Sequence, residues 1–245
     1  MSKAADFLVE IGTEELPPKA LPSLMDAFGD GLAAGIEEGR LSHGDDHTYA
    51  SPRRLAVIVD TLAGSQDDRA VEQKGPPVSV AFDDNNEPTP AATEFAARCG
   101  VAVDALERVE TNKGEWLIHK SVEQGKSAAV LLPDIIERAL DALRFLGRML
   151  WVAGVAVFER AVDGIVLAHG DEVIDASIMG IAAGRDSRGH RFHSSGPISI
   201  ASPADYLRAL EDKGRVIADF ERRRGMVREG VDAAAQRAGG HVVDG

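Results

Sequence analysis

Hydrophobic residues recur with a period of two at the start of the chain and with helical spacing shortly afterwards. Residues 7–11 read Phe-Leu-Val-Glu-Ile, an alternation that predicts a strand ended by Gly12. After Pro17 and Pro18, apolar residues spaced three and four apart predict an amphipathic helix, although three glycines lower its propensity. The apolar face of that helix is formed by Leu21, Leu24, Met25, Phe28 and Leu32.

The same patterns continue through the rest of the chain. Apolar runs predict buried strands at 55–62, 150–158 and 165–168, and a further strand at 116–122. Helices are predicted over 90–99, after Pro133 and after Asp219, which is placed as a helix cap. We therefore expect an α+β fold, with a mixed, mainly antiparallel sheet and flanking helices. We also expect the chain to divide near residue 125 into two α+β lobes, 1–124 and 125–245.

Composition narrows the class of protein. The 245 residues are 44% hydrophobic and 27% charged, as in ordinary soluble domains. The 40 acidic residues against 27 lysines and arginines, a net charge of −13, argue against a general nucleic-acid-coating protein but leave room for a local basic surface. Cys99, the single cysteine, excludes an internal disulfide and is expected in a core. With no signal segment and no apolar stretch long enough for a bilayer, we expect a cytoplasmic protein.

The basic loop, residues 185–193, reverses this acidic balance locally and lies in the second expected lobe. Its guanidinium groups suit bidentate contacts to phosphate, and its rings could stack on RNA bases. Gly189 in its centre favours a turn over a helix. The alternative is a loop that only neutralises acidic neighbours. The candidate RNA-binding residues are Arg185, Arg188, His190, Arg191 and His193, with Phe192 as a stacking face.

No residue pattern predicts catalysis or metal binding. His190 and His193 could ligate a metal with Asp186, but the neighbouring arginines would repel the cation. Ser194 lacks the strand–turn–helix setting of a nucleophile. Of Arg53 and Arg54, which precede an apolar strand, only one can follow the buried face, so one is expected to be structural and the other available to a phosphate. We therefore predict no catalytic residue, no metal and no cofactor in this segment.

Seven phrases, in order and spacing, carry a resemblance that covers nearly the whole chain. Together they resemble the N-terminal part of the β subunit of bacterial heterotetrameric glycyl-tRNA synthetase. The phrases are FLVEIGTEELPP (7–18), SPRRLA (51–56), KGPPV (74–78), KGEWL (113–117), RDSRGHRFH (185–193), ASPADY (201–206) and VIADFERR (216–223).

The resemblance implies a function that the residues alone do not give. The whole enzyme attaches glycine to tRNA using ATP, and glycine activation belongs to the separate α subunit. This segment would then support tRNA binding and assembly with the α subunit, with contact between two β subunits also compatible. The chain is expected to be truncated at Gly245, because 242–243 look like the start of a strand and the family's helical HD-type and anticodon-binding domains come later.

Two departures from the family pattern limit what is transferred. Residues 148–151 read RMLW where the family has RMRW, and 158–164 read FERAVDG where it has FVRPVHW. RNA binding is therefore not carried over to 144–164. Two other functions stay open: a hydrolase-type editing domain that acts on mischarged tRNA through His190 or His193, and a pure protein-interaction module.

Overall fold

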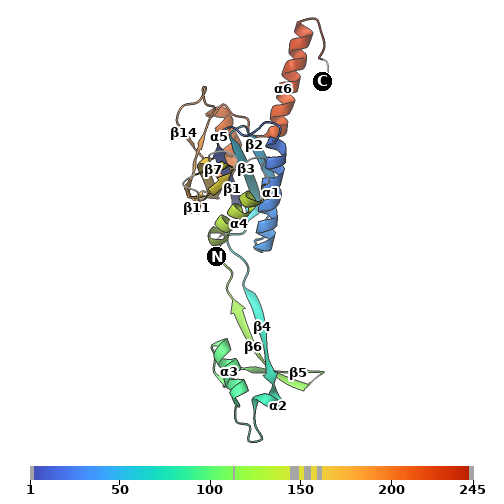
Figure 1. Cartoon of the computed structure of the whole chain (residues 1–245), viewed down its shortest axis with the longest axis vertical. Coiled ribbons are helices and arrows are strands. Elements are labelled where there is room, and N and C mark those ends of the chain that lie inside the picture. The colour runs from blue at the N-terminus through green and yellow to red at the C-terminus, as the bar shows by residue number, and fades with distance from the viewer. Residues whose placement is uncertain (1–2, 113, 144–148, 152–155, 159–161, 243–245) are drawn as a thin grey trace. The chain divides into compact units, whose positions relative to one another are not determined.

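The structure is a computed structural model that describes residues 3–112, 114–143, 149–151, 156–158 and 162–242 (Figure 1). It divides into two units, one formed by Met1–Gln66 with Lys126–Gly245 and the other by Asp67–Gly125. This division differs from the consecutive lobes 1–124 and 125–245. The chain leaves the first unit at Gln66 and returns at Lys126, where Gln66 N–H donates to the Lys126 carbonyl at 2.9 Å. Linear order alone does not show that 1–66 and 126–245 share one core.

A seven-stranded sheet forms the centre of the first unit. Its order is β11-β12-β9-β1-β3-β2, with β10 paired to β9. The central strand β1 is antiparallel to both neighbours, and only β12 runs parallel to β9. The α+β class and the mainly antiparallel sheet are therefore confirmed. The strands are β1 (Ala5–Thr13), β2 (Asp46–Ser51), β3 (Arg54–Leu62), β9 (Val162–His169), β10 (Glu172–Val173), β11 (Ser177–Ile178) and β12 (Ile181–Gly184).

Two helices, α1 (Leu21–Glu38) and α4 (Ala128–Ala142), cover one face of this sheet. The glycines that lower the helix propensity of α1 allow close packing. A Cβ at Gly29 would lie 2.3 Å from Thr48 Cγ2, and one at Gly35 would lie 2.5 Å from Ile135 Cγ2. α4 begins before Pro133, which lies inside the helix, so the sequence placed the start of this helix too late.

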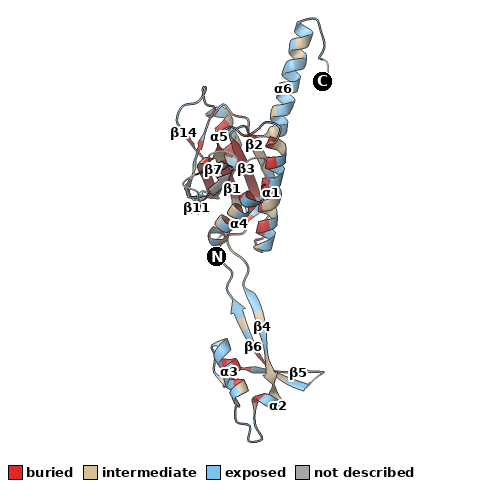
Figure 2. Ribbon diagram, in the orientation of Figure 1, coloured by how far each residue is buried: buried red, intermediate tan, exposed pale blue. Residues whose placement is uncertain are grey.

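The opposite face of the sheet is covered by η2 (Pro203–Asp205), α5 (Tyr206–Asp212) and the hairpin β13 (Asp186–Arg188) and β14 (Pro197–Ser199). Side chains of this layer, including Tyr206 and Ile198, pack with Leu8 in a second core. β1 is thus buried on both faces, as Figure 2 shows. Because of this double burial, Glu10 is buried, although the alternating pattern around it suggests a strand with one exposed face.

The last helix, α6 (Phe220–Arg237), has no buried residue and is mostly exposed (Figure 2). Its predicted cap is confirmed, because the Asp219 carboxylate accepts the Arg222 N–H at 3.0 Å. Strands β7 (Met149–Trp151) and β8 (Ala156–Phe158) pair with each other in place of one run over 150–158. Of the departures from the family pattern, Leu150, Asp163 and Gly164 are described, whereas Glu159 and Ala161 lie outside the described residues, as does Val243 of the strand expected at 242–243.

The second unit is a three-stranded antiparallel sheet, order β4-β6-β5, that packs against two helices. Gly75 lies against Phe95, whose ring would be 2.4 Å from a Cβ there, and Lys74 lies over the Trp116 ring. The KGPP phrase is thus part of the packing. Cys99 is half-buried and packs against this core, so it lies at the edge of the core and is less buried than expected. The elements are β4 (Arg69–Pro77), α2 (Val78–Ala81), α3 (Pro90–Cys99), η1 (Val103–Ala105), β5 (Glu107–Thr111) and β6 (Gly114–Glu123).

Candidate functional site

The basic loop starts on β13 and turns after Gly189 toward β14, so the predicted turn is confirmed. Ser187, in β13, is buried, whereas the segment 191–193 is exposed. Phe192 is 82% exposed, an unusual state for a large aromatic side chain. The loop therefore has an anchored base on β13 and an exposed tip at 191–193.

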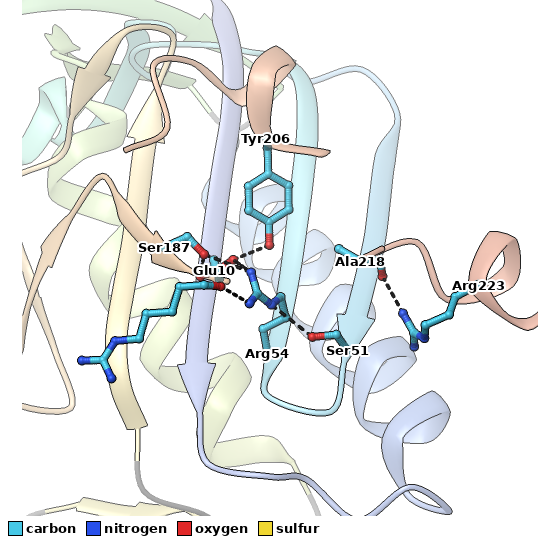
Figure 3. Close-up of polar contacts among 8 residues, drawn as sticks. Glu10, Ser51, Arg54, Ser187, Tyr206, Ala218 and Arg223 are labelled. Atoms are coloured by element: carbon cyan, nitrogen blue, oxygen red, sulfur yellow. Dashed lines mark hydrogen bonds and ion pairs between the residues drawn. The ribbon is translucent and has the colours of Figure 1, made fainter. Parts of the chain in front are cut away.

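A buried network of five polar side chains, Glu10, Ser51, Arg54, Ser187 and Tyr206, lies beneath this loop (Figure 3). Glu10 and Arg54 are each only 3% exposed. Arg54 Nη1 donates to Glu10 Oε2 at 3.0 Å and to Ser187 Oγ at 3.0 Å, and Ser187 donates to Glu10 Oε1 at 2.6 Å. Tyr206 donates its phenolic proton to Glu10 as well.

Arg54 also binds the backbone of the loop directly. Its Nη2 donates to the carbonyl oxygen of Arg188, and its Nε donates to Ser51 Oγ at 3.1 Å. The buried guanidinium therefore joins β1, β3 and the base of the basic loop. Because buried charges are tolerated only when they are fully paired, this arrangement fixes where β13 ends.

The ionisation of the network follows from the same contacts. Burial is the largest influence on Arg54 and alone would lower its pKa, but the charge and hydrogen-bond interactions with Glu10 and Tyr206 together outweigh burial, so the pKa is raised. Burial raises the pKa of Tyr206 well above its ordinary value, and the negative charge of Glu10 adds to this effect. Both shifts favour one state, a cationic Arg54 and a neutral Tyr206 that donates to Glu10.

Arg53 points to a different set of partners. Its Nη2 donates to Asp163 Oδ2 at 3.2 Å and to Glu14 Oε1 at 3.3 Å, and Asp163 Oδ2 also accepts from Arg188 at 3.1 Å. Arg54 is thus the structural member of the pair, as expected for one of the two. Arg53, the other member, already has two carboxylate partners. Its expected availability to a phosphate stays a prediction.

The five candidate RNA-binding residues differ in how far their side chains already have partners within the protein. Arg185 donates to the Asp171 carbonyl at 3.0 Å, and Arg188 is 65% exposed but paired with Asp163. The imidazoles of His190 and His193 stack with ring centroids 4.4 Å apart. Arg191 is exposed and has no hydrogen-bond or ion-pair partner among the described residues. The side chains best placed for an external ligand are therefore at the tip, 191–193.

Two hollows adjoin the loop. The sheet-end hollow, about 770 Å³, is lined by both charged networks and by Thr13, whose buried hydroxyl has no partner in the described part of the chain. The inter-loop pocket, about 290 Å³, lies between Gly189–Phe192 and Arg215–Ile217. The described residues contain no cluster of three or more potential metal-ligating side chains.

Comparison with known proteins places this geometry in a family. Residues 7–244 match the family model described as glycyl-tRNA synthetase beta subunit. The chain belongs to this family. Glycine–tRNA ligase beta subunits of Marinobacter nauticus and Hahella chejuensis are 46% and 47% identical over 239 and 238 residues, 97% of this chain in each case. That of Edwardsiella ictaluri is 42% identical over 234 residues, or 96% of the chain.

The chain spans about a third, 34%, of the length of these curated relatives. No described helix of this family member has the length and apolar character needed to cross a membrane. The phrases that carried the resemblance supply Glu10, Arg54, Ser187 and Tyr206, so four of them meet in the buried network. In this glycyl-tRNA synthetase β-subunit segment, four of the seven phrases of the sequence signature thus meet at one site.

Sequence reasoning missed several residues of this site, among them Glu10 with its partner Tyr206, and Arg215. Glu10 was read as a position on a strand with alternating burial, and only the double burial of β1 shows its role. Arg215 lines the inter-loop pocket but lies outside the basic loop in the sequence. The signal that could have found it is its place directly before the phrase 216–223.

Proposed function

We propose that this segment contributes to tRNA binding by glycyl-tRNA synthetase through the tip of the basic loop. The observation that supports this most is Phe192, 82% exposed between the exposed Arg191 and His193. RNA-binding surfaces combine such aromatic faces for bases with guanidinium groups for phosphates. In a chain of net charge −13, an exposed arginine beside an exposed aromatic ring provides a local positive charge for a phosphate and a surface on which a base can stack.

The segment's place in the enzyme is proposed from its relatives, which are named glycine–tRNA ligase beta subunits. We infer that it assembles with the α subunit and supplies no catalytic group, and that glycine activation with ATP occurs on that subunit. The test is to mix the 245-residue chain with glycine, ATP and tRNA. No charged tRNA is expected, and charging above background would contradict this assignment.

A hydrolytic role finds less support in the geometry. The Ser194 hydroxyl donates to the Lys213 carbonyl at 3.0 Å, and His190 Nδ1 accepts the Phe192 N–H at 3.2 Å. Neither contact pairs a nucleophile with an imidazole base, which is the arrangement that nucleophilic catalysis needs. Release of amino acid from mischarged tRNA by this chain would favour the editing alternative.

The binding proposal is tested with Arg191→Ala in the complete α/β enzyme. Losing one phosphate contact should flatten the log–log dependence of tRNA affinity on salt by roughly 0.7 to 0.9. Arg138→Ala is the control, because Arg138 is an exposed arginine on α4, paired with Glu38 on the other face of the sheet. An unchanged slope for Arg191→Ala in a folded enzyme would show that the tip does not contact tRNA.

A further inference from the structure

The basic loop has a neighbour that the sequence does not reveal, the segment 213–217 after α5. The two backbones touch: His190 N–H donates to the Gly214 carbonyl at 2.6 Å, and a Cβ at Gly189 would lie 2.7 Å from Gly214 Cα. Ser194 adds a hydrogen bond to the Lys213 carbonyl. Two glycines therefore let the segments pack together, and the inter-loop pocket lies beside this contact.

The charge of this pocket is opposite to that of the chain. Its lining includes five arginines and one carboxylate, that of Glu15. Three of the arginines are already used, because Arg54 and Arg53 have carboxylate partners and Arg223 donates to backbone carbonyls, including that of Ile217 at 2.6 Å. Figure 3 shows Arg223 directed at the carbonyl of Ala218.

Arg191 and Arg215 remain, one from each segment. Both are exposed, and neither side chain has a hydrogen-bond or ion-pair partner in the part of the chain that the structure describes. Two such guanidinium groups lining one pocket, in an otherwise acidic protein, are an arrangement suited to a bound phosphate.

Apolar and aromatic side chains also line the pocket. Phe192 belongs to the basic loop, and Pro52, Val216 and Ile217 come from the other segments, together with the polar Ser51. A volume of about 290 Å³ is close to the lower end of small-ligand pockets, roughly 300–1,000 Å³, so it suits one nucleotide and not a helix. Aromatic faces beside cations are how proteins hold unpaired bases.

We propose that the inter-loop pocket binds a single unpaired nucleotide of an RNA, with its base against Phe192 and its phosphate between Arg191 and Arg215. This inference rests on the proposed tRNA contact of the loop tip and goes further by naming the ligand as single-stranded and by adding Arg215. The sheet-end hollow shares Arg53, Arg54 and Arg191 with the inter-loop pocket, but of the two hollows only the inter-loop pocket is lined by Phe192 and Arg215, so we place the site there.

The experiment compares two RNA probes on the 245-residue chain, a labelled single-stranded hexanucleotide and a blunt duplex of the same length. The chain should prefer the single strand. Phe192→Ala should weaken single-strand binding by about 5- to 150-fold, the cost of one lost base stack of about 1–3 kcal/mol. Arg215→Gln should flatten the salt slope by roughly 0.7, Arg215→Lys should largely restore it, and Arg138→Gln should change nothing.

The outcomes separate this inference from the proposed function. If Arg191→Ala weakens binding while Arg215→Gln leaves affinity and slope unchanged, the loop contacts RNA but the pocket does not. If the duplex binds as well as the single strand, stacking of an unpaired base is excluded. If neither arginine matters in a chain whose circular dichroism is unchanged, both proposals fail.

Discussion

Two arginines of the basic-loop region have opposite surroundings, Arg54 beneath the base of the loop and Arg191 at its tip. Arg54 is 3% exposed and donates to Glu10, to two serines and to the loop's own backbone. Arg191 is exposed, with no hydrogen-bond or ion-pair partner among the described residues. All three guanidinium nitrogens of Arg54 donate to groups within the protein and hold the base of the loop in place. The guanidinium of Arg191 is left available for a ligand. Burial, and not residue type, decides which arginine is structural.

The strongest way to break this comparison is Arg54→Met. Removing the cation leaves Glu10 buried with one partner fewer, and breaking a buried pair costs about 3–5 kcal/mol of unfolding free energy. Urea unfolding followed by circular dichroism measures this cost. Arg53→Met is the matched control and should cost less, because the Arg53 side chain is 23% exposed and its Glu14 partner 51%. Equal losses for both variants would contradict a special structural role of Arg54.

Tyr206→Phe tests the same network with a smaller change. The variant keeps the ring, which packs with Leu8 and Leu210, and removes only the donor to Glu10. A buried carboxylate that loses one hydrogen bond should cost about 1–3 kcal/mol. The same unfolding measurement applies, and a loss as large as that of Arg54→Met would mean that the ring's packing had also changed.

The pKa of Tyr206 adds a dependence on pH. Because this pKa is raised above that of an unfolded tyrosine, about 10, the neutral phenol stabilises the fold at all lower pH values, and this contribution is lost as the pH rises further. The stability gap between the native chain and Tyr206→Phe should therefore narrow above roughly pH 10. The chain has two tyrosines, so tyrosinate absorbance in the variant reports Tyr49 alone. A constant gap would exclude a protonated Tyr206 as the donor.

Part of this site could be predicted from sequence, and the missing part has a common cause. Local patterns located β1, α1, β3 and the turn at Gly189, since each depends on neighbours within a few residues. The partners of Glu10 could not be predicted, because Tyr206 and Ser187 come from segments more than 170 residues away. The same holds for the inserted second unit, because its flanking residues Gln66 and Lys126 are hydrogen-bonded although they lie 60 residues apart in the sequence.

Gly189→Ala probes the link between the two segments. A Cβ would meet Gly214 Cα at 2.7 Å and Ser194 Oγ at 2.4 Å, and the backbone contact cannot be relieved by a side-chain rotation. The segments should move apart, so single-stranded RNA should bind several-fold more weakly, while the unfolding free energy falls by roughly 1–3 kcal/mol. Gly225→Ala, on exposed α6 with no atom within 4 Å of the added Cβ, is the control. Unchanged RNA binding by Gly189→Ala would show that the segments act separately.

The smallest effect is expected for Arg185→Ala, which sharpens the comparison within the basic loop itself. Arg185 belongs to the same basic phrase as Arg191, but its guanidinium donates to the Asp171 carbonyl, and it lines neither hollow. If proximity in sequence decided RNA binding, the two alanine variants would weaken affinity equally. If placement decides it, Arg185→Ala should leave the salt slope unchanged and alter affinity by less than about twofold, as expected for a charge that makes no phosphate contact. Titration of tRNA against both variants of the α/β enzyme at several salt concentrations distinguishes these cases. Equal slopes for the two variants would mean that the whole loop, and not its tip, faces the RNA.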